Sequence, residues 1–341
     1  MTKKIIICIL FVVVLINISV AFFLLKNRSF SHLAIWNIIE SREKGDFYWE
    51  PEEAPQYFYF EPDTDKLTIF RDEIALIVED EQTEFTIALA IAKHLMDISP
   101  QGDYSGMRLR WDSPESMLRQ IKDGARGHCF HRAILLSSYL ASLGIKSRLW
   151  ALENEGFDGV AHSINEIYVK DLGKWVFIDA THGFYAMSKE SDLPLSFLEL
   201  REMLLKSPSD KVRMHNIRED VEPLEIAPFY RRLVKCAFLR ANNDFVNKYE
   251  VRYGYFSSCN RYLDKLPASI RRGLDYLLGG RDVFIHYVDG FSKSLRQKMI
   301  IVKAFFYFFI FSLGCLGLFS AMFFLKKYLT INRSRNATRH K

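Results

Sequence analysis

The chain has 341 residues, with 46 Lys and Arg against 41 Asp and Glu, and its formal charge of +5 is unevenly distributed. Residues 1–28 and 300–341 hold eleven of the basic residues and no acidic residue, which leaves 35 basic against 41 acidic residues between them. A nucleic-acid-binding domain needs a basic face on its folded part. The acidic middle of this chain gives no support for one, so we expect no nucleic-acid partner.

The first element in the chain is an apolar segment of 21 residues, from Ile5 to Leu25, interrupted only by Asn17 and Ser19. About 20 apolar residues suffice for a helix to cross the hydrocarbon core of a bilayer. A cleaved signal peptide is the alternative, but the apolar run is longer than the usual 7–15 residues, and no Ala-x-Ala site follows it. We therefore predict an N-terminal transmembrane anchor.

Residues 29–109 form an aromatic lead-in followed by a helix that we expect from about Glu81 to Asp97. Ser113 and Pro114 then mark a helix start, because serine caps free backbone amides and proline suits the first helical position. That short helix is expected to end at Gly124.

A further helix is predicted to begin at or just after Cys129 and to end at Gly144, because apolar residues recur at helical spacing up to a glycine. Three short strands are expected next, at residues 146–152, 162–169 and 175–178, the last two joined by a compact turn at residues 170–174. After about residue 185 we expect a mostly helical region, with helices around residues 193–206, 222–240 and 267–278. The aromatic and basic stretch at residues 249–262 is interpreted as packing surface.

The last element is a second apolar segment, 22 residues from Ala304 to Leu325, which we also predict to span a membrane. The basic residues that follow it, with no acidic residue among them, favour a cytoplasmic C-terminus. With two spans the N-terminus lies on the same side, and the domain between the spans is extracytoplasmic. A cytosolic domain is the alternative, which would change the substrates but not the chemistry.

Five cysteines do not indicate a disulfide framework. Cys8 and Cys315 lie in the apolar segments, and Cys236 and Cys259 are free to pair or not in an exported domain. Cys129 is then the cysteine that remains outside the apolar segments and outside that pair.

Cys129 lies where a helix is predicted to start, and the unpaired amides and dipole of a helix N-terminus favour the thiolate, which is the nucleophilic form. His162 opens one predicted strand and Asp179 closes the next, so the tight turn between the strands should bring the two side chains close together. Taken singly, each has a structural interpretation: a buried thiol, a strand histidine and a turn aspartate. Their order and context favour a catalytic triad.

Four motifs in this region resemble the transglutaminase-like superfamily over about residues 110–185. They are Gly127-His128-Cys129 at a helix start, Gly144-Ile145-Lys146-Ser147-Arg148 at an elbow, His162 with Glu166 on a strand, and Trp175 with Asp179-Ala180-Thr181 on the next. The family's usual Asp-Pro-Thr is Asp-Ala-Thr here, which leaves the aspartate in place.

The resemblance implies an α+β, papain-like transglutaminase core, in which a Cys-bearing helix packs on an antiparallel sheet, here flanked by two transmembrane helices. If each residue has the role of its counterpart in the family motif, Cys129 is the nucleophile, His162 is the base and later the acid, and Asp179 is the carboxylate that orients His162. The implied reaction is acyl transfer through a thioester, without a cofactor. The amide of Cys129 is one expected oxyanion donor, and Trp111 is a guess for the second.

Other interpretations remain open at this point. His128, Cys129, His131 and His162 are zinc-binding residue types, but no Cys-x-x-Cys or His-x-x-x-His pair supports a metal, and we expect none. His182 either lines the site or ends the strand, and we favour the second interpretation. The alternative to an enzyme is a membrane-tethered scaffold or binding module that retains the fold. The substrate of the enzyme would be a peptide, a protein or an envelope polymer.

The sequence therefore divides into five expected regions: a transmembrane anchor at residues 1–28, the lead-in and helical segment at 29–109, the catalytic core at 110–185, a mostly helical extension at 186–299, and a transmembrane helix with a basic tail at 300–341.

Overall fold

The computed structural model describes residues 3–26, 37–55, 58, 65–78, 83–99, 113–154, 161–206, 211–218, 226–241 and 283–339. These form two compact units, one of residues 1–35 with 296–341 and one of residues 36–295. The predicted helix at residues 267–278 and the aromatic stretch at residues 249–262 lie outside the described part, as do Trp111 and Cys259.

The larger unit is built on one sheet of eight strands in the order β1-β8-β7-β2-β3-β4-β5-β6. Among the described strands, β1 and β8 pair in parallel and the other neighbours pair antiparallel. The strands are β1 (Asn37–Ser41), β2 (Ser147–Glu153), β3 (Ala161–Val169), β4 (Lys174–Asp179), β5 (Phe184–Ser188), β6 (Val212–Asn216), β7 (Cys236–Arg240) and β8 (Val283–Tyr287). The architecture is mixed α+β, as the sequence predicted.

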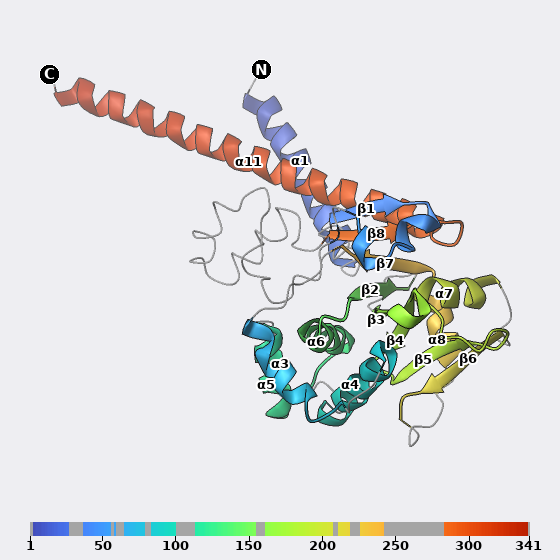
Figure 1. Cartoon of the computed structure of the whole chain (residues 1–341). Coiled ribbons are helices and arrows are strands. Elements are labelled where there is room, and N and C mark those ends of the chain that lie inside the picture. Colours follow the sequence, from blue (N-terminus) through green and yellow to red (C-terminus); the bar gives the residue numbers. More distant parts are fainter. Residues whose placement is uncertain are drawn as a thin grey trace. The chain divides into compact units, whose positions relative to one another are not determined.

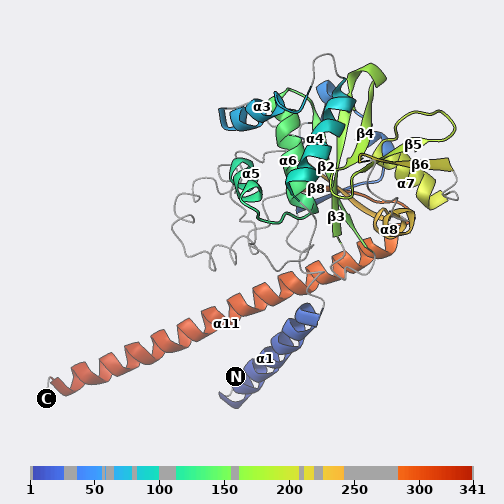
Figure 2. The ribbon, with the colours of Figure 1, turned by 90° about the horizontal axis from the view of Figure 1, so that it is seen from below.

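Four helices pack on one side of the central strands (Figures 1 and 2): α3 (Thr68–Ile74), α4 (Glu84–Ile98), α5 (Pro114–Lys122) and α6 (Cys129–Ser142). The predicted start of α5 is confirmed, since Ser113 Oγ accepts from the Ser116 amide at 3.1 Å. Gly144, just past the end of α6, adopts φ +74°, the left-handed conformation that favours glycine after a helix. The buried apolar residues of α4 and α6 pack in one cluster with those of β3 and β4.

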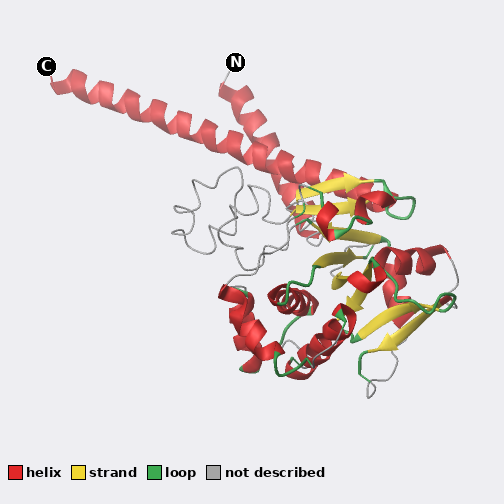
Figure 3. Ribbon diagram, viewed as in Figure 1, coloured by secondary structure: helices red, strands yellow, loops and turns green. Residues whose placement is uncertain are grey.

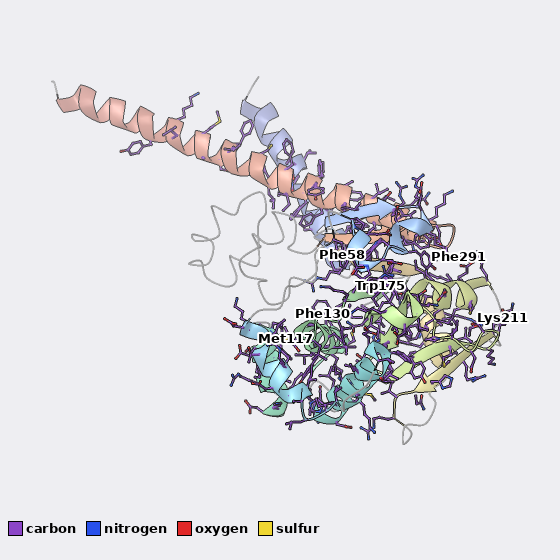
Figure 4. All side chains as sticks on the ribbon, viewed as in Figure 1. Phe58, Met117, Phe130, Trp175, Lys211 and Phe291 are labelled. Atoms are coloured by element: carbon purple, nitrogen blue, oxygen red, sulfur yellow. The ribbon has the colours of Figure 1, made fainter. Side chains whose placement is uncertain are left out.

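A second apolar cluster lies on the other side of the strands, with α7 (Phe197–Lys206) and α8 (Ile226–Leu233) (Figure 2). Successive side chains of a strand point to opposite faces. Accordingly Val176 and Ile178 of β4 join the first cluster, while Trp175 and Phe177 join the second. Met117 and Trp175, one from each cluster, are labelled in Figure 4. The sheet is therefore covered on both faces.

Two of the motif residues, Arg148 and Glu166, form a buried ion pair across β2 and β3. Arg148 Nε donates to Glu166 Oε2 at 2.6 Å, and Trp150 Nε1 donates to the same oxygen at 2.5 Å. The Phe197 amide donates to Glu166 Oε1 at 2.7 Å, and Arg148 Nη1 donates to the Phe47 carbonyl at 2.7 Å. These two motif residues thus tie the sheet to the lead-in and to α7.

The structure corrects the prediction for residues 186–299. We expected mostly helix, but the described part of this range alternates strands with the helices α7 and α8 (Figure 3). Within residues 222–240, predicted as one helix, the described residues 226–240 form α8 and then β7. Every residue of β7 is buried, and a short apolar run buried on both faces has no periodicity that distinguishes a strand from a helix.

The smaller unit consists of α1 (Lys3–Lys26) and the larger part of α11 (Lys293–Arg339). Val20 and Val302 are buried together, and Ser312 Oγ donates to Asn17 Oδ1. Among the described residues, one helical stretch, Lys293–Met322, is long and apolar enough to cross a membrane, and the apolar stretch Phe11–Phe23 is shorter. The second predicted span thus has a matching helix, and the two-span arrangement stays a prediction.

Candidate active site

Cys129 is the first residue of α6, as the sequence predicted. The residue before it, His128, has extended backbone angles of φ −96° and ψ 174°, and its amide donates to His131 Nδ1 at 3.0 Å. That bond fixes the entry of the chain into the helix. Cys129 is partly exposed and forms no disulfide. Its sulfur therefore lies at the end of the helix where amides are unpaired and the dipole is positive.

His162 and Asp179 are in direct contact, as the hairpin predicted. His162 Nε2 lies 2.7 Å from Asp179 Oδ2, and the two side chains are 3% and 0% exposed. His162 is the second residue of β3 and Asp179 is the last of β4, and these strands pair antiparallel from Asn165↔Ile178 onward. The hairpin register therefore sets the distance between the imidazole and the carboxylate.

Both carboxylate oxygens of Asp179 accept hydrogen bonds. The backbone amides of Thr181 and His182 donate to Oδ1 at 2.8 Å and 3.1 Å. His182 Nδ1 at 2.8 Å and the Tyr230 hydroxyl at 2.7 Å bond to Oδ2, as does His162. A carboxylate with this many donors is held ionised in a buried place.

The charges of the three groups support one another. Burial opposes ionisation of Cys129, but the hydrogen bond and the charge of His162 outweigh it, so the pKa of the thiol is lowered. Burial also opposes a charged His162, yet the Asp179 carboxylate raises the pKa of His162 to about 10. The pKa of Asp179 is held well below its ordinary value, because His162 and His182 outweigh burial. At pH values above the lowered pKa of Cys129 and below about 10, these shifts favour a Cys129 thiolate beside a His162 imidazolium.

The structure thus brings together the three residues predicted for the site, and it adds two further side chains that contact Asp179. His182, interpreted as a strand end, instead contacts Asp179 and lies with its ring 4.6 Å from that of His162. Tyr230 comes from α8, a region in which we found no catalytic motif. Nothing local in the sequence marks Tyr230, because its contact with Asp179 spans 51 residues.

A cation could also be held here by geometry alone. One ligand atom each from His162, Asp179 and His182 lies within 4.8 Å of the other two, and these residue types bind zinc. This set differs from the one considered from the sequence, which joined His128 and His131 to Cys129 and His162. His162 Nε2 and His182 Nδ1 both already form hydrogen bonds with Asp179 Oδ2, so these atoms of the set have hydrogen-bond partners without a metal.

Residues 74–180 match the family model of the transglutaminase-like superfamily, so the chain contains a transglutaminase-like domain. The match begins at the end of α3 and ends one residue after Asp179. A comparison with curated proteins and another with solved structures found no match. The domain defines a class of protein that includes cysteine hydrolases and acyltransferases. Tyr230 lies outside the matched segment and is contributed by the rest of this chain.

Gly183 closes the turn after Asp179 and gives a testable prediction. Its φ is +71°, and a Cβ at this position would collide with the end of the Met96 side chain. Gly144 has a similar φ of +74° with open space around it. A left-handed alanine costs about 1–2 kcal/mol at either position. We expect Gly183→Ala to lower the melting temperature more than Gly144→Ala, because Met96 must also move. Equal losses would show that Met96 moves without cost.

Proposed function

We propose that this protein is a membrane-anchored, transglutaminase-like cysteine hydrolase or acyltransferase that acts on amide or isopeptide bonds. Cys129 is the nucleophile, His162 the base and then the acid, and Asp179 the carboxylate that orients His162. The observation that carries the proposal is the contact of the His162 imidazole with the buried Asp179 carboxylate, together with the position of Cys129 at the N-terminus of α6. The lowered pKa of the Cys129 thiol, caused by the hydrogen bond and charge of His162, supports its role as nucleophile.

In the first half of the proposed reaction, the Cys129 thiolate attacks the carbonyl carbon of the substrate and a carbon–sulfur bond forms. The backbone amide of Cys129, in the first turn of α6, is the proposed donor to the oxyanion. When the intermediate collapses, the carbon–nitrogen bond breaks and the amine leaves with the proton of the His162 imidazolium. The products are a free amine, a thioester on Cys129 and a neutral His162.

In the second half, neutral His162 takes a proton from water or from an acceptor amine, which attacks the thioester. The carbon–sulfur bond breaks and the thiolate is restored beside the imidazolium. Water gives hydrolysis, and an amine gives transamidation. Asp179 stays ionised throughout, because its acceptor positions are filled by the donors described above.

The proposal is tested by the reactivity of the thiol. Because the pKa of Cys129 is lowered, Cys129 should be alkylated by iodoacetamide at pH 6, where an ordinary thiol with a pKa of about 8.5 is mostly protonated. Buried Cys236 is expected to react more slowly than Cys129 in the same sample, and every cysteine of the denatured chain should react more slowly than Cys129 does in the folded chain. Alkylation is located by mass spectrometry of the peptides. If Cys129 reacts at pH 6 no faster in the folded chain than after denaturation, the scaffold alternative is favoured.

The second arm of the test traps the acyl-enzyme. Native membrane extract is quenched with acid, and the Cys129 peptide is examined for an added acyl group. A thioester adduct that is absent from Cys129→Ala supports the enzyme and identifies the substrate as a peptide, a protein or an envelope polymer.

Membrane anchoring through α1 and α11 is part of the proposal and predicts a topology. With two spans and the basic tail after the second, both termini are cytoplasmic and the catalytic domain is extracytoplasmic. Reporter fusions measure this directly. We expect a C-terminal fusion to an enzyme that works only after export to be inactive, and a fusion after residue 206 to be active. The reverse pattern would place the domain in the cytosol.

A further inference from the structure

Arg132 is a buried cation one helical turn after Cys129, with an exposure of 2%. Its Nη1 donates to the Thr181 carbonyl at 2.9 Å, and its Nη2 donates to the carbonyl of Ser99, the C-cap residue of α4. Among the described residues, its hydrogen-bond acceptors are these two carbonyl oxygens and no carboxylate, and its Nε has no acceptor. The positive charge of Arg132 is therefore not neutralised by an ion pair within the described part of the chain.

The Thr181 carbonyl belongs to the same peptide group as the His182 amide, and that amide donates to Asp179 Oδ1. Arg132 therefore donates to the carbonyl of the 181–182 peptide, while the amide of the same peptide donates to the Asp179 carboxylate. A donor on the carbonyl polarises the amide on the far side and strengthens its hydrogen bond. The contact also fixes the turn after β4, in which Asp179 accepts both Thr181 and His182 amides.

These contacts close a ring that begins and ends on α6. From Arg132 the ring runs through the 181–182 peptide to Asp179, from Asp179 to His162, and from His162 to the Cys129 sulfur. Cys129 and Arg132 are three residues apart, so they lie on the same face of the helix. A rigid helix turn therefore fixes both ends of the ring.

We infer that Arg132 is a positioning residue for the proposed reaction: it anchors the Asp179 turn to the nucleophile helix and adds positive charge beside the thiolate. The inference rests on the proposed function. The charge of Arg132 interacts with both Asp179 and Cys129. Burial lowers the pKa of Arg132 from its ordinary value, and these two anions oppose the shift.

Charged and titratable groups in the described part near the thiol come from several elements besides Arg132. They include His162 on β3, Asp179 on β4, His182 in the following turn and Tyr230 on α8. His128 and His131 flank Cys129 at the start of α6, and the Arg240 guanidinium of β7 lies over the ring of Phe130, the residue after Cys129. Removing the charge of Arg132 should make the thiolate harder to form, while these other groups stay in place.

The test measures the alkylation rate of Cys129 against pH in the full-length protein in detergent micelles, resolved by mass spectrometry. Arg132→Met and Arg132→Gln remove the charge, and Arg132→Lys keeps it. Exposed Arg126, three residues before Cys129, gives the matched control Arg126→Gln. We expect the neutral variants to shift the midpoint of the curve to higher pH. Below both midpoints, a shift of one pH unit slows alkylation about tenfold.

Arg126→Gln should leave the midpoint unchanged, and Arg132→Lys should keep it close to wild type with a lower melting temperature, because one ammonium replaces a two-pronged guanidinium. A folded neutral variant with the wild-type midpoint would overturn the inference, since a purely structural arginine changes only the melting temperature. If neither neutral variant melts cooperatively, Arg132→Lys decides: a midpoint as high as that of the denatured chain contradicts the role. A wild-type midpoint equal to that of the denatured chain would instead refute the proposed function.

Discussion

Replacing His162 by alanine is expected to reduce turnover by about 10²–10⁴-fold, the usual range for a general acid–base residue. The physical reason is that His162 has two tasks in this site. In the proposed mechanism it favours the thiolate of Cys129, and it supplies the proton with which the amine leaves. Cys129→Ala should abolish the covalent route altogether. Turnover is measured on the substrate found by acyl-enzyme trapping, or on a simple activated ester.

The double variant Cys129→Ala/His162→Ala should be scarcely worse than either single variant, because residues that act as one unit are strongly non-additive. Asp179→Asn keeps the shape of the side chain but removes the charge that holds the imidazolium. We expect it to reduce turnover less than His162→Ala, since nucleophile and base both remain. Its pH profile should also change, because the pKa of His162 falls once the carboxylate is gone.

Thermal melting of each variant is the control, because all three residues are packed among other groups and a variant can lose activity by unfolding. Cys129→Ala and His162→Ala that melt like the wild type and are inactive support the proposed roles. Variants that melt normally and keep the wild-type activity would show that these residues serve only the fold.

Breaking the buried ion pair of Arg148 and Glu166 is expected to destabilise the fold by about 3–5 kcal/mol, because one charge is left buried without its partner. Glu166→Gln leaves a guanidinium that is 1% exposed, with its centre 4.3 Å from the Trp175 ring centroid. Arg148→Met leaves a carboxylate with only Trp150 and the Phe197 amide as donors. Chemical denaturation of the full-length protein in detergent measures the loss in free energy of unfolding.

The double variant Arg148→Met/Glu166→Gln should lose less than the two single variants together, since no unpaired charge remains. The exposed pair of Lys211 and Glu190, with side chains 48% and 65% exposed, is the matched control. Glu190→Gln should change the free energy of unfolding by about 0–1 kcal/mol. A loss for Glu166→Gln as small as that for Glu190→Gln would contradict the structural importance of the buried pair.

The fold of the site was predictable wherever a local signal was sufficient. The start of α6 at Cys129, its end before Gly144 and the β3–β4 hairpin each depend on residues close together in the sequence. Helix periodicity, capping and the conformation of glycine are all set within a few residues. The proximity of His162 and Asp179 followed from these elements, because a tight hairpin leaves its two ends side by side.

The same limit explains the errors in the remainder of the chain. We expected residues 29–109 to be a lead-in, but Asn37–Ser41 in it forms β1, which pairs in parallel with β8 near the other end of the larger unit. A parallel pair so distant in the sequence leaves no turn signal to find. The strand β7 was missed for a related reason, because a short strand that is buried on both faces lacks an alternating pattern.

By itself the sequence determined the identity of Cys129, His162 and Asp179 as candidates, the hairpin that joins the last two, and the two apolar segments at the ends. Only the tertiary structure decided which groups surround them. Tyr230 reaches Asp179 across 51 residues, and Arg132 reaches Thr181 across 49. Such contacts arise when whole elements pack, and their energy depends on burial and direction. No local pattern of residues encodes either quantity.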